Sequence, residues 1–375
     1  MEENKIIAYK GFDENLKCRG FQYEVGKEYE HDGEVECCRS GFHACKNPFD
    51  VLDYYDANGK NRFCVVEQSG TIKSEHKDSK QSSSKIKIKA EIGIAGLFKA
   101  GVEWIKEKTN PDKIIKSIKK NENTESGDYA QIGSSGNYAQ IGSSGNYAQI
   151  GSSGYAAKIG SSGNAAQIGS SGESAQIGSS GNSAKIGSSG YAAKIGSSGY
   201  AAQIGSSGES AKIGSSGYAA QIGSSGESAQ IGSSGNYAQI GSSGDAAQIG
   251  SSGESAQIGS SGNYAKIGSS GESAQIGSSG NSAKIGSSGY AAKIGSSGYA
   301  AKIESSGEDS VICCAGNNSM AKAKKGSWIT LSEWKYSEDK KRDIPVCVRT
   351  EFVDGERIKE DTWYKLIDGE FVEQK

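Results

Sequence analysis

Thiols and imidazoles cluster near the start of the chain, where together they could hold a metal ion. The cluster consists of Cys18, His31, Cys37, Cys38, His43 and Cys45. Sets of four such side chains are the usual ligands of Zn²⁺ in proteins. The spacing here matches no common zinc motif. We therefore expect buried, reduced thiols at these positions, and we predict no metal site and no cofactor.

A second group of side chains in the same region could grip a nucleotide. It comprises Tyr9, Arg19, His43 and Tyr54. A strand carrying Tyr or Arg, then Gly-Phe-His, then a helix with paired tyrosines loosely resembles ADP-ribosyltransferase-like folds, and the resemblance implies an NAD site at these four residues. The late catalytic glutamate of such folds is not assignable, because Glu67 is the only nearby candidate. We expect no catalytic residues and no enzyme, with an NAD-binding domain as the alternative.

Ordinary strand and helix patterns must position these residues. Residues 6–9 and 62–66 read as strands and residues 48–55 as a short helix, which predicts a small α+β domain over residues 1–72. Residues 73–124 follow as a linker, an alternating strand at 85–94 and helical segments interrupted at Pro111. We expect the helical part to cover the first coil of the repeat region that follows, because exposed strand edges invite further stacking.

Residues 125–303 repeat one nine-residue phrase twenty times, Ser-Ser-Gly-x-x-Ala-(Gln or Lys)-Ile-Gly. The alternation of polar and apolar residues places Ala and Ile on one face of a strand, and Gly-Ser-Ser-Gly is typical of a turn. One unit offers too little apolar surface to offset the entropy of ordering nine residues, so units must stack. The repeats predict a mainly β protein built on a parallel β-solenoid.

Two units per coil fit the repeat better than three, because one Ala and one Ile per side would leave a triangular interior unfilled. Twenty units then give ten coils, and each buried Ile contributes about 2 kcal/mol before entropy is counted. A block of four variable pairs at residues 173–201 recurs at 272–300, eleven units later. An odd shift exchanges the faces, so we expect the faces to be equivalent.

The two variable residues of each unit lie beside the turn and carry the tyrosines of the repeat. Tyrosine suits protein interfaces because its large ring also carries a hydrogen-bonding group. The alternative is a solvated edge that avoids crowding. The candidate partner-binding residues are Tyr155, Tyr191, Tyr200, Tyr218, Tyr237, Tyr264, Tyr290 and Tyr299.

Composition argues against several classes of function. The net charge is −2, and the repeats balance Lys against acids, so no specific nucleic-acid partner is indicated. Acids are too sporadic in the turns for the calcium sites of β-roll repeats. The first residues lack an apolar signal core and no run is long enough to span a membrane, so we expect a cytoplasmic protein.

The repeat decays after residue 303. Glu304 stands where the repeat has glycine, and Trp328 is larger than the side chains of the repeat. These changes predict degenerate coils and a C-terminal cap over residues 304–330. Residues 331–375 contain two apolar strand patterns, and Asp-Gly pairs at 354–355 and 368–369 are typical of hairpin turns. A terminal β-hairpin or meander is therefore expected.

The chain as a whole resembles a group of uncharacterised phage and prophage proteins. The phrases that carry the resemblance are Tyr-Lys-Gly-Phe at residues 9–12, Gly-Phe-His-Ala-Cys-Lys-Asn-Pro at 41–48, the Ala-Gln-Ile-Gly-Ser-Ser-Gly repeats and Gly-Ser-Trp-Ile-Thr-Leu at 326–331. The resemblance implies expression in a bacterial host. We expect a non-enzymatic scaffold that binds a protein partner, which could be a bacterial defence system that it inhibits. A structural or adhesive component of a phage particle is the alternative, and the oligomeric state is not indicated.

The inward placement of isoleucine gives the first testable prediction. Replacing Ile222 in the middle of the rod by Asp places an unpaired charge in the core, which costs several kcal/mol. We expect limited proteolysis to cut the variant near this coil while the native rod stays protected. Unchanged protection would contradict an inward Ile222.

Overall fold

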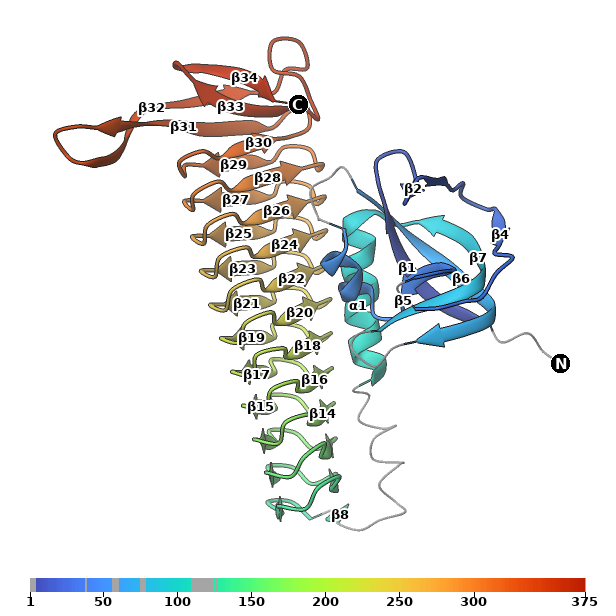
Figure 1. Ribbon diagram of the computed structural model, residues 1–375. Helices are drawn as coiled ribbons and strands as arrows, with labels where there is room; N and C mark the ends of the chain where they lie inside the picture. Colours follow the sequence, from blue (N-terminus) through green and yellow to red (C-terminus); the bar gives the residue numbers. More distant parts are fainter. Residues whose placement is uncertain are drawn as a thin grey trace. The chain divides into compact units, whose positions relative to one another are not determined.

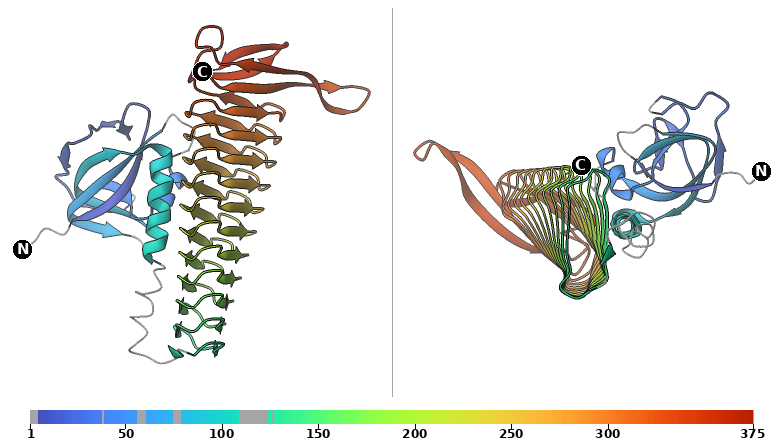
Figure 2. Two further views of the ribbon diagram at one scale, coloured as in Figure 1. Left: turned by 180° about the vertical axis from the view of Figure 1, so that it is seen from behind. Right: turned by 90° about the horizontal axis from the view of Figure 1, so that it is seen from below.

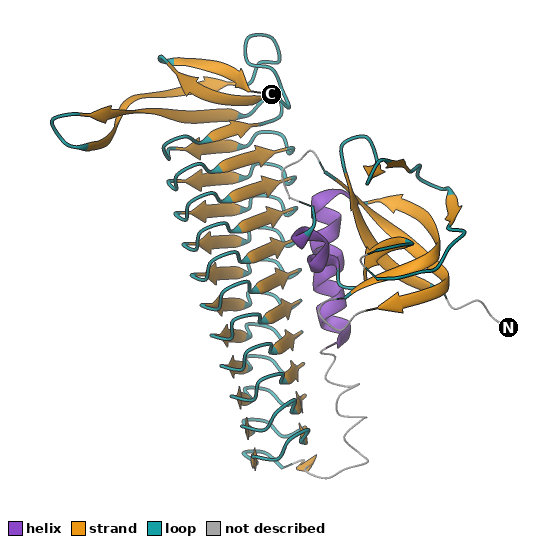
Figure 3. Ribbon diagram, in the orientation of Figure 1, coloured by secondary structure: helices purple, strands orange, loops and turns teal. Residues whose placement is uncertain are grey.

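The structure, a computed structural model, describes residues 5–37, 39–55, 61–74, 79–108, 124–125 and 127–374. It is mainly β, as predicted, with a parallel β-solenoid of about 11 turns over residues 131–331, a small N-terminal β domain and a C-terminal β-meander. Strands dominate the ribbon in Figure 3. The chain divides into two compact units, Met1–Trp104 and Ile105–Lys375. None of the helices in the described residues is long and apolar enough to cross a membrane.

The N-terminal unit is a five-stranded antiparallel sheet with the order β4-β7-β5-β1-β6. Its strands are β1 (Ile6–Phe12), β4 (Glu28–Glu30), β5 (Phe42–Cys45), β6 (Arg62–Ser74) and β7 (Lys80–Glu91). β6 also pairs with β7, so β7, β5, β1 and β6 close into a ring that Figure 1 shows around a common interior. A short hairpin of β2 (Lys17–Cys18) and β3 (Phe21–Gln22) lies outside this ring.

The N-terminal domain extends beyond its predicted end at residue 72, because β7 belongs to its sheet. The sequence analysis ended the domain at residue 72 and treated the alternating stretch as part of a linker. Ile86 and Ile88 instead have no exposed surface and lie in the core with Phe12 and Val66, while the lysines between them face outward. The strand itself was predicted, but its place in the N-terminal sheet was not, because periodicity identifies a strand without naming its neighbours.

Two helical segments complete the N-terminal unit. Residues 48–53 form a 3₁₀ helix, η1 (Pro48–Asp53), where the side chain of Asn47 accepts a hydrogen bond from the backbone N–H of Phe49. α1 (Gly93–Lys108) follows β7, as its helical spacing predicted. Phe98 of α1 packs edge-on against Phe49 with ring centroids 5.7 Å apart, and a Cβ on Gly101 would lie 2.4 Å from the same ring.

α1 therefore packs against η1 of its own unit, and the expected cover of the first coil stays a prediction. Leu97 and Phe98 are buried among the side chains of α1 that the structure describes. The helix predicted after Pro111 lies outside the described residues.

The solenoid consists of two parallel sheets, each built from every second repeat. One sheet contains β9 (Gln131–Ser134), β11 (Gln149–Ser152), β13 (Gln167–Ser170), β15 (Lys185–Ser188), β17 (Gln203–Ser206), β19 (Gln221–Ser224), β21 (Gln239–Ser242), β23 (Gln257–Ser260), β25 (Gln275–Ser278), β27 (Lys293–Ser296) and β29 (Val311–Cys314). The other contains β8 (Thr124–Glu125), β10 (Gln140–Ser143), β12 (Lys158–Ser161), β14 (Gln176–Ser179), β16 (Lys194–Ser197), β18 (Lys212–Ser215), β20 (Gln230–Ser233), β22 (Gln248–Ser251), β24 (Lys266–Ser269), β26 (Lys284–Ser287) and β28 (Lys302–Ser305).

Within each sheet of the regular coils, a strand residue lies opposite the residue eighteen positions away in the chain. One coil therefore contains two nine-residue repeats, which confirms the prediction. Ile222, for example, lies opposite Ile204 in one neighbour and Ile240 in the other. The view along the solenoid in Figure 2 shows successive coils nearly superimposed with a gradual twist. Ile222 is 3 % exposed and Ala220 is fully buried, so both residue types point inward as predicted. The first serine after each isoleucine-glycine pair is also inward, as at Ser224, which the sequence analysis had placed in the turn.

The third residue of Ser-Ser-Gly must be glycine, because successive turns stack at backbone contact distance. A Cβ on Gly226 would lie 1.8 Å from the carbonyl oxygen of Gly208, one coil earlier. The second variable residue mostly adopts the left-handed region, as at Ser228 (φ 57°) and Ala246 (φ 55°). That conformation costs about 1–2 kcal/mol for an L-residue. It lets the N–H of Ser228 donate to the carbonyl oxygen of Asp245 in the next coil at 2.8 Å, which links the turns.

Antiparallel strands end the solenoid at its C-terminus. β30 (Met320–Lys322) pairs with β33 (Trp363–Ile367), which pairs with β34 (Glu370–Gln374), and β31 (Trp328–Ser337) pairs with β32 (Arg342–Phe352). The predicted degenerate coils are present as β29, β30 and the start of β31. Gly369 (φ 77°) lies in the turn between the paired strands β33 and β34, as predicted. Gly355 (φ 84°) instead lies between β32 and β33, which belong to different sheets, so the hairpin predicted at residues 354–355 is wrong.

An ion pair between the last regular coil and the cap explains why the repeat pattern changes at Glu304. The Nζ of Lys322 lies 2.9 Å from Oε1 of Glu304, and both side chains are largely buried. The same ammonium lies 5.2 Å from the ring centroid of Trp363. Where the parallel stack ends, an ion pair and a cation–π contact thus take the place of the neighbouring glycines of the regular coils.

Two glycines three residues apart should respond oppositely to alanine. Gly226→Ala forces a methyl group into the carbonyl oxygen of the preceding coil and should destabilise the rod by about 2–4 kcal/mol. Gly223→Ala meets no heavy atom within 4 Å and should leave stability unchanged or raise it by about 0.5–1 kcal/mol. Denaturant unfolding followed by circular dichroism measures both, and equal effects would contradict the stacking geometry.

Candidate functional site

Three surface features of the described residues could bind a ligand or partner: the tyrosine-bearing edges of the solenoid, a trough on one of its faces, and a pocket in the N-terminal unit. The edges are the two columns of turns that join the sheets. The first edge comprises the turns after the β9–β29 strands, and the second comprises the turns after the β8–β28 strands. The eight predicted tyrosines lie on these edges, and all are between 41 % and 64 % exposed.

Several tyrosines of the repeat pack against one another along the edges. Tyr200 and Tyr218 on the second edge are parallel, with ring centroids 5.2 Å apart, and Tyr237 continues the column at 5.1 Å from Tyr218. Tyr129 and Tyr147 stack on the same edge at 5.1 Å. Tyr138 and Tyr155 meet edge to face on the first edge. The column at Tyr200, Tyr218 and Tyr237 is an exposed aromatic strip of the kind that protein interfaces use.

Asparagine at the first variable position has a structural role that spacing did not reveal. Oδ1 of Asn164 accepts a hydrogen bond of 3.0 Å from the backbone N–H of Asn182, one coil later, and Asn182 does the same for Tyr200. Asp245 and Asn263 continue this pattern on the first edge. These ladders join neighbouring turns, so the asparagines belong to the scaffold while the tyrosines beside them remain available for contact.

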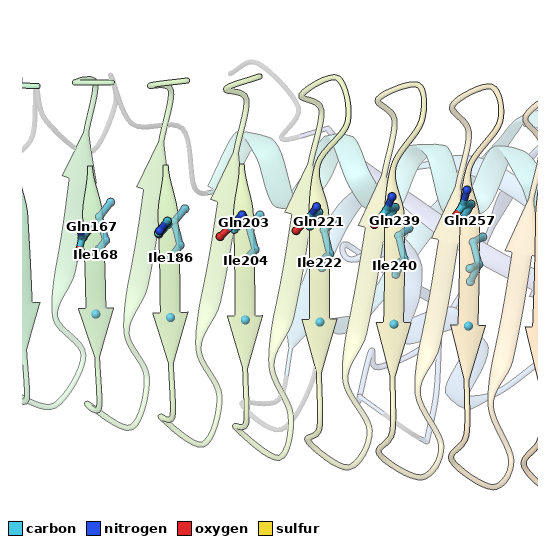
Figure 4. A pocket seen from close by; sticks show the side chains of 18 of the residues that line it. Gln167, Ile168, Ile186, Gln203, Ile204, Gln221, Ile222, Gln239, Ile240 and Gln257 are labelled. Carbon is cyan, nitrogen blue, oxygen red and sulfur yellow. The ribbon is translucent and has the colours of Figure 1, made fainter. Parts of the chain in front are cut away.

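A trough runs along the outward side of the β9–β29 sheet, which we call the glutamine face. Its floor is a column of ten glycines, Gly133, Gly151, Gly169, Gly187, Gly205, Gly223, Gly241, Gly259, Gly277 and Gly295. A parallel column of Gln and Lys borders the floor, and Figure 4 shows Gln203, Gln221 and Gln239 in one file along it. The trough encloses about 1740 Å³.

The two outward columns differ in charge, which corrects the expectation of equivalent faces. The ridge on the glutamine face contains eight Gln and two Lys, namely Lys185 and Lys293. The corresponding column of the β10–β28 strands contains four Gln and six Lys. Because one sheet takes every second repeat, the difference becomes visible only when odd and even units are read separately.

The glutamine face ends in apolar residues at the C-terminal side. Val311 continues the ridge in register with Lys293, and Trp328 continues it in turn. Val311 is 49 % and Trp328 is 47 % exposed. Cys313 and Thr330 occupy the glycine column at the same levels, so the backbone accepts side chains at this position.

A pocket in the N-terminal unit brings together Tyr9, Arg19, His43 and Tyr54, the four residues of the alternative NAD site. The cavity has a volume of about 590 Å³. Its lining is aromatic and basic, and the remaining residues are Lys10, Gly11, Cys18, Phe21, Tyr23, His31, Arg39, Ser40, Gly41, Phe42, Ala44, Cys45, Val51, Tyr55 and Lys80. Sequence reasoning did not assign Lys10, within β1, or Lys80, the first residue of β7, to this site.

Lys10 lies in the pocket wall with 5 % of its surface exposed. Its Nζ donates to the carbonyl oxygen of His43 at 2.9 Å and lies 3.4 Å from Sγ of Cys18. No carboxylate belongs to the described part of the pocket lining, and burial lowers the pKa of this lysine from its usual value. A ligand that supplied negative charge would stabilise the protonated amine.

His43 presents an unsatisfied nitrogen at the pocket. Its Nε2 is buried and has no hydrogen-bond partner among the described residues, and the ring also interacts with the backbone of Glu36. Burial, together with the charges of Lys10 and Arg19, lowers the pKa of His43 from 6.5 to about 4. The imidazole is therefore neutral at pH 7, and Nε2 can accept a hydrogen bond from a ligand.

Tyr55 fixes the floor of the pocket. Its hydroxyl donates to Sγ of Cys18 at 2.9 Å, and its ring lies where a side chain on Gly11 would be, 2.4 Å from an ideal Cβ. Burial raises the pKa of Tyr55 well above its usual range, so the hydroxyl keeps its proton. Glycine at position 11 is thus required for this tyrosine to pack on β1.

The predicted cysteine and histidine cluster does not assemble as one set. Cys18, Cys45 and both histidines line the pocket, whereas Sγ of Cys37 lies 3.9 Å from the carbonyl oxygen of Lys80 and Cys38 lies outside the described residues. Among the residues that the structure describes, no three metal-binding side chains converge. Burial raises the pKa of Cys64 to about 12, which keeps this core thiol protonated.

Glu67, the tentative catalytic glutamate, does not line the pocket. Its carboxylate lies 3.4 Å from Nζ of Lys5 and 3.2 Å from Nζ of Lys89. These contacts, of which the hydrogen bond from Lys89 is the strongest, lower the pKa of Glu67. The pocket therefore lacks the carboxylate that the resemblance to ADP-ribosyltransferases implies.

Residues 6–100 match a family model described as a domain of unknown function, DUF7666. The matched segment includes all of β7 and the first half of α1, in agreement with the N-terminal unit of the structure rather than with a boundary at residue 72. No curated protein and no solved structure matches the chain. The pocket thus belongs to the DUF7666 region, and the solenoid lies outside it.

The environment of His43 predicts how the DUF7666 region responds to acid. The unfolded chain takes up a proton near pH 6.5, but the folded ring does so only near pH 4, so stability falls as the pH drops between these values. The loss should be on the order of 1–3 kcal/mol, discounted because the ring is half-buried. NMR titration of the His43 ring should give a midpoint near 4, and His43→Gln should flatten the stability profile. A midpoint near 6.5 would show that the ring is solvated.

Proposed function

We propose that this protein is a non-enzymatic binding scaffold whose solenoid engages a protein partner along the glutamine face. The observation that carries the proposal is the glycine column of the trough. A Cβ at any of its ten positions would meet no heavy atom within 4 Å, and none of these glycines has a positive φ. Neither packing nor backbone conformation therefore requires glycine there.

Glycine in a strand normally weakens the sheet, because it adds backbone entropy and contributes no side chain to packing. A glycine that the fold does not require marks a place where another backbone or ligand approaches closely. Ten such positions in one column form a flat strip over the whole length of the regular coils. The strip suits an extended or β-rich partner that lies along the rod.

The borders of the trough supply the other parts of an interface. The glutamine ridge offers amide donors and acceptors at the strand spacing of about 4.8 Å. The exposed Trp328 and Val311 close the C-terminal end with apolar surface, where tryptophan is a frequent energetic anchor. The tyrosine column at Tyr200, Tyr218 and Tyr237 flanks the face along one edge.

The resemblance to phage and prophage proteins supports a bacterial or phage protein as the partner. Inhibition of a host defence protein in the cytoplasm is the form of binding that we favour. A structural or adhesive part of a phage particle is the second reading, in which the rod would contact other particle proteins. Both readings use the same face, and the identity of the captured protein separates them.

Filling the trough tests the proposal. In the full-length protein, Gly205, Gly223 and Gly241 are changed together to Thr, the residue that already occupies this column at position 330. Because a Cβ at each of these positions meets no heavy atom within 4 Å and Thr favours strands, thermal stability should be unchanged or slightly higher. A photo-crosslinking residue at Gly187 should trap one discrete protein from phage-infected bacteria with the native rod, and the triple variant should lose at least about tenfold in yield.

Gly286 provides the matched control, because it lies on the opposite sheet and a Cβ there also meets nothing within 4 Å. Gly286→Thr should retain the crosslinked species. Equal yields from the native protein and the triple variant, or no discrete species at all, would refute binding at the glutamine face.

A further inference from the structure

We propose that the pocket of the N-terminal unit binds a small organic anion that carries a planar ring, of the nucleotide class. The proposal concerns the DUF7666 region alone and does not depend on the function of the rod. It rests on charge, on exposed aromatic rings and on an unsatisfied acceptor that converge in one cavity of about 590 Å³. That volume lies within the usual range of about 300–1,000 Å³ for small-molecule sites.

Among the residues that the structure describes, four cationic side chains line the cavity and no aspartate or glutamate does. They are Lys10, Arg19, Arg39 and Lys80. Arg39 contacts Glu36 outside the cavity, but the charge of Arg19 acts on the pocket interior, where it disfavours protonation of both Lys10 and His43. Burying Lys10 beside other cations without a carboxylate is unfavourable unless an anion joins them. Phosphate oxygens would relieve that repulsion through charge-assisted hydrogen bonds.

Arg19 lies in the turn of the β2–β3 hairpin. Arg19 and Gly20 form its two-residue loop with φ of 51° and 80°, the positive values that a type I′ hairpin turn requires. The turn projects a guanidinium at the pocket, where its planar fork can bind two phosphate oxygens.

Aromatic rings at the pocket leave surface uncovered. Phe21 is 46 % exposed and Tyr54 is 49 % exposed. Phe21 is held from behind by edge-on contacts with Tyr23 and Tyr29 at 4.8 and 5.3 Å between centroids. A firmly held, exposed ring is a stacking platform for a base, and stacking contributes about 1–3 kcal/mol.

The unsatisfied Nε2 of His43 adds a specific acceptor to this charged and aromatic surface. Leaving a buried polar atom without a partner costs about 1–3 kcal/mol. A ribose hydroxyl or an exocyclic amine supplies the missing donor. An uncharged aromatic compound would contact the rings but bring no negative charge to the cationic side chains. Only a ligand with both parts uses all of these features.

Isothermal titration of the full-length protein tests the proposal with three probes, ADP, adenosine and inorganic pyrophosphate. ADP should bind with a dissociation constant in the micromolar range. Adenosine and pyrophosphate should each bind at least about tenfold more weakly, because each lacks half of the contacts. Arg19→Gln should weaken ADP binding by about tenfold or more, and Phe21→Ala should weaken adenosine and ADP but leave pyrophosphate unchanged.

Lys17→Gln is the matched control, because Lys17 is exposed on β2 two residues before Arg19 and does not line the cavity. It should bind ADP as the native chain does. The proposal is overturned if ADP does not bind at millimolar concentration, if pyrophosphate binds as tightly as ADP, or if Arg19→Gln and Lys17→Gln have equal effects. Failure here leaves the crosslinking result on the glutamine face unaffected, so the two proposals fail separately.

Discussion

In-register stacking of identical coils is the constraint on which the solenoid depends. One coil buries two isoleucines and two alanines, and neither its backbone nor its apolar surface is complete without the coils on either side. The stack fixes the rest of the unit. Each turn glycine must let a carbonyl oxygen of the preceding coil approach, as Gly226 does for Gly208. The second residue after the glycine, such as Ser228, must direct its N–H toward the next coil. The strain of that rotation is offset by the hydrogen bond that it makes possible.

A stack of this kind has open edges at both ends, and the C-terminal end solves the problem by reversing direction. Antiparallel β33 stands where the next parallel strand would be. A buried ion pair between Lys322 and Glu304 stands where the regular coils have two glycines side by side. The interior also carries a polar element, because inward serines such as Ser242 have hydroxyls without a partner among the described residues. Cys314 and Leu331 take over that column near the cap. Apolar packing therefore increases where the stack must stop.

Periodicity predicted most of the rod and little of the sites. The alternation of polar and apolar residues predicted the strands, the turns and the inward position of Ile222. The small apolar volume of each repeat predicted two units per coil. Periodicity could not show that Ser224 points inward, because a hydroxyl beside a glycine is also ordinary turn chemistry. It could not place β7 in the N-terminal ring, since pairing partners are not written in a strand's own residues. The pocket residues Tyr9, Arg19, His43 and Tyr54 were named together only through a resemblance, while Lys10 and Lys80 carried no local signal.

The difference between the two solenoid faces is a feature that the fold does not impose. The block at residues 173–201 and its copy at 272–300 are separated by an odd number of units, so Lys185 on the glutamine face corresponds to Lys284 on the opposite sheet, and Lys194 there corresponds to Lys293 on the glutamine face. Either face therefore accepts lysine without a change in backbone. The ridge of the glutamine face is nonetheless mostly uncharged, and its glycine column is unbroken through the regular coils. Register is the same for both sheets, but burial of the outward columns is not: Gly160 and Gln230 of the β10–β28 strands are buried, whereas Gly169 and Gln239 of the glutamine face are exposed. The difference in charge between the faces therefore accompanies a difference in their surroundings.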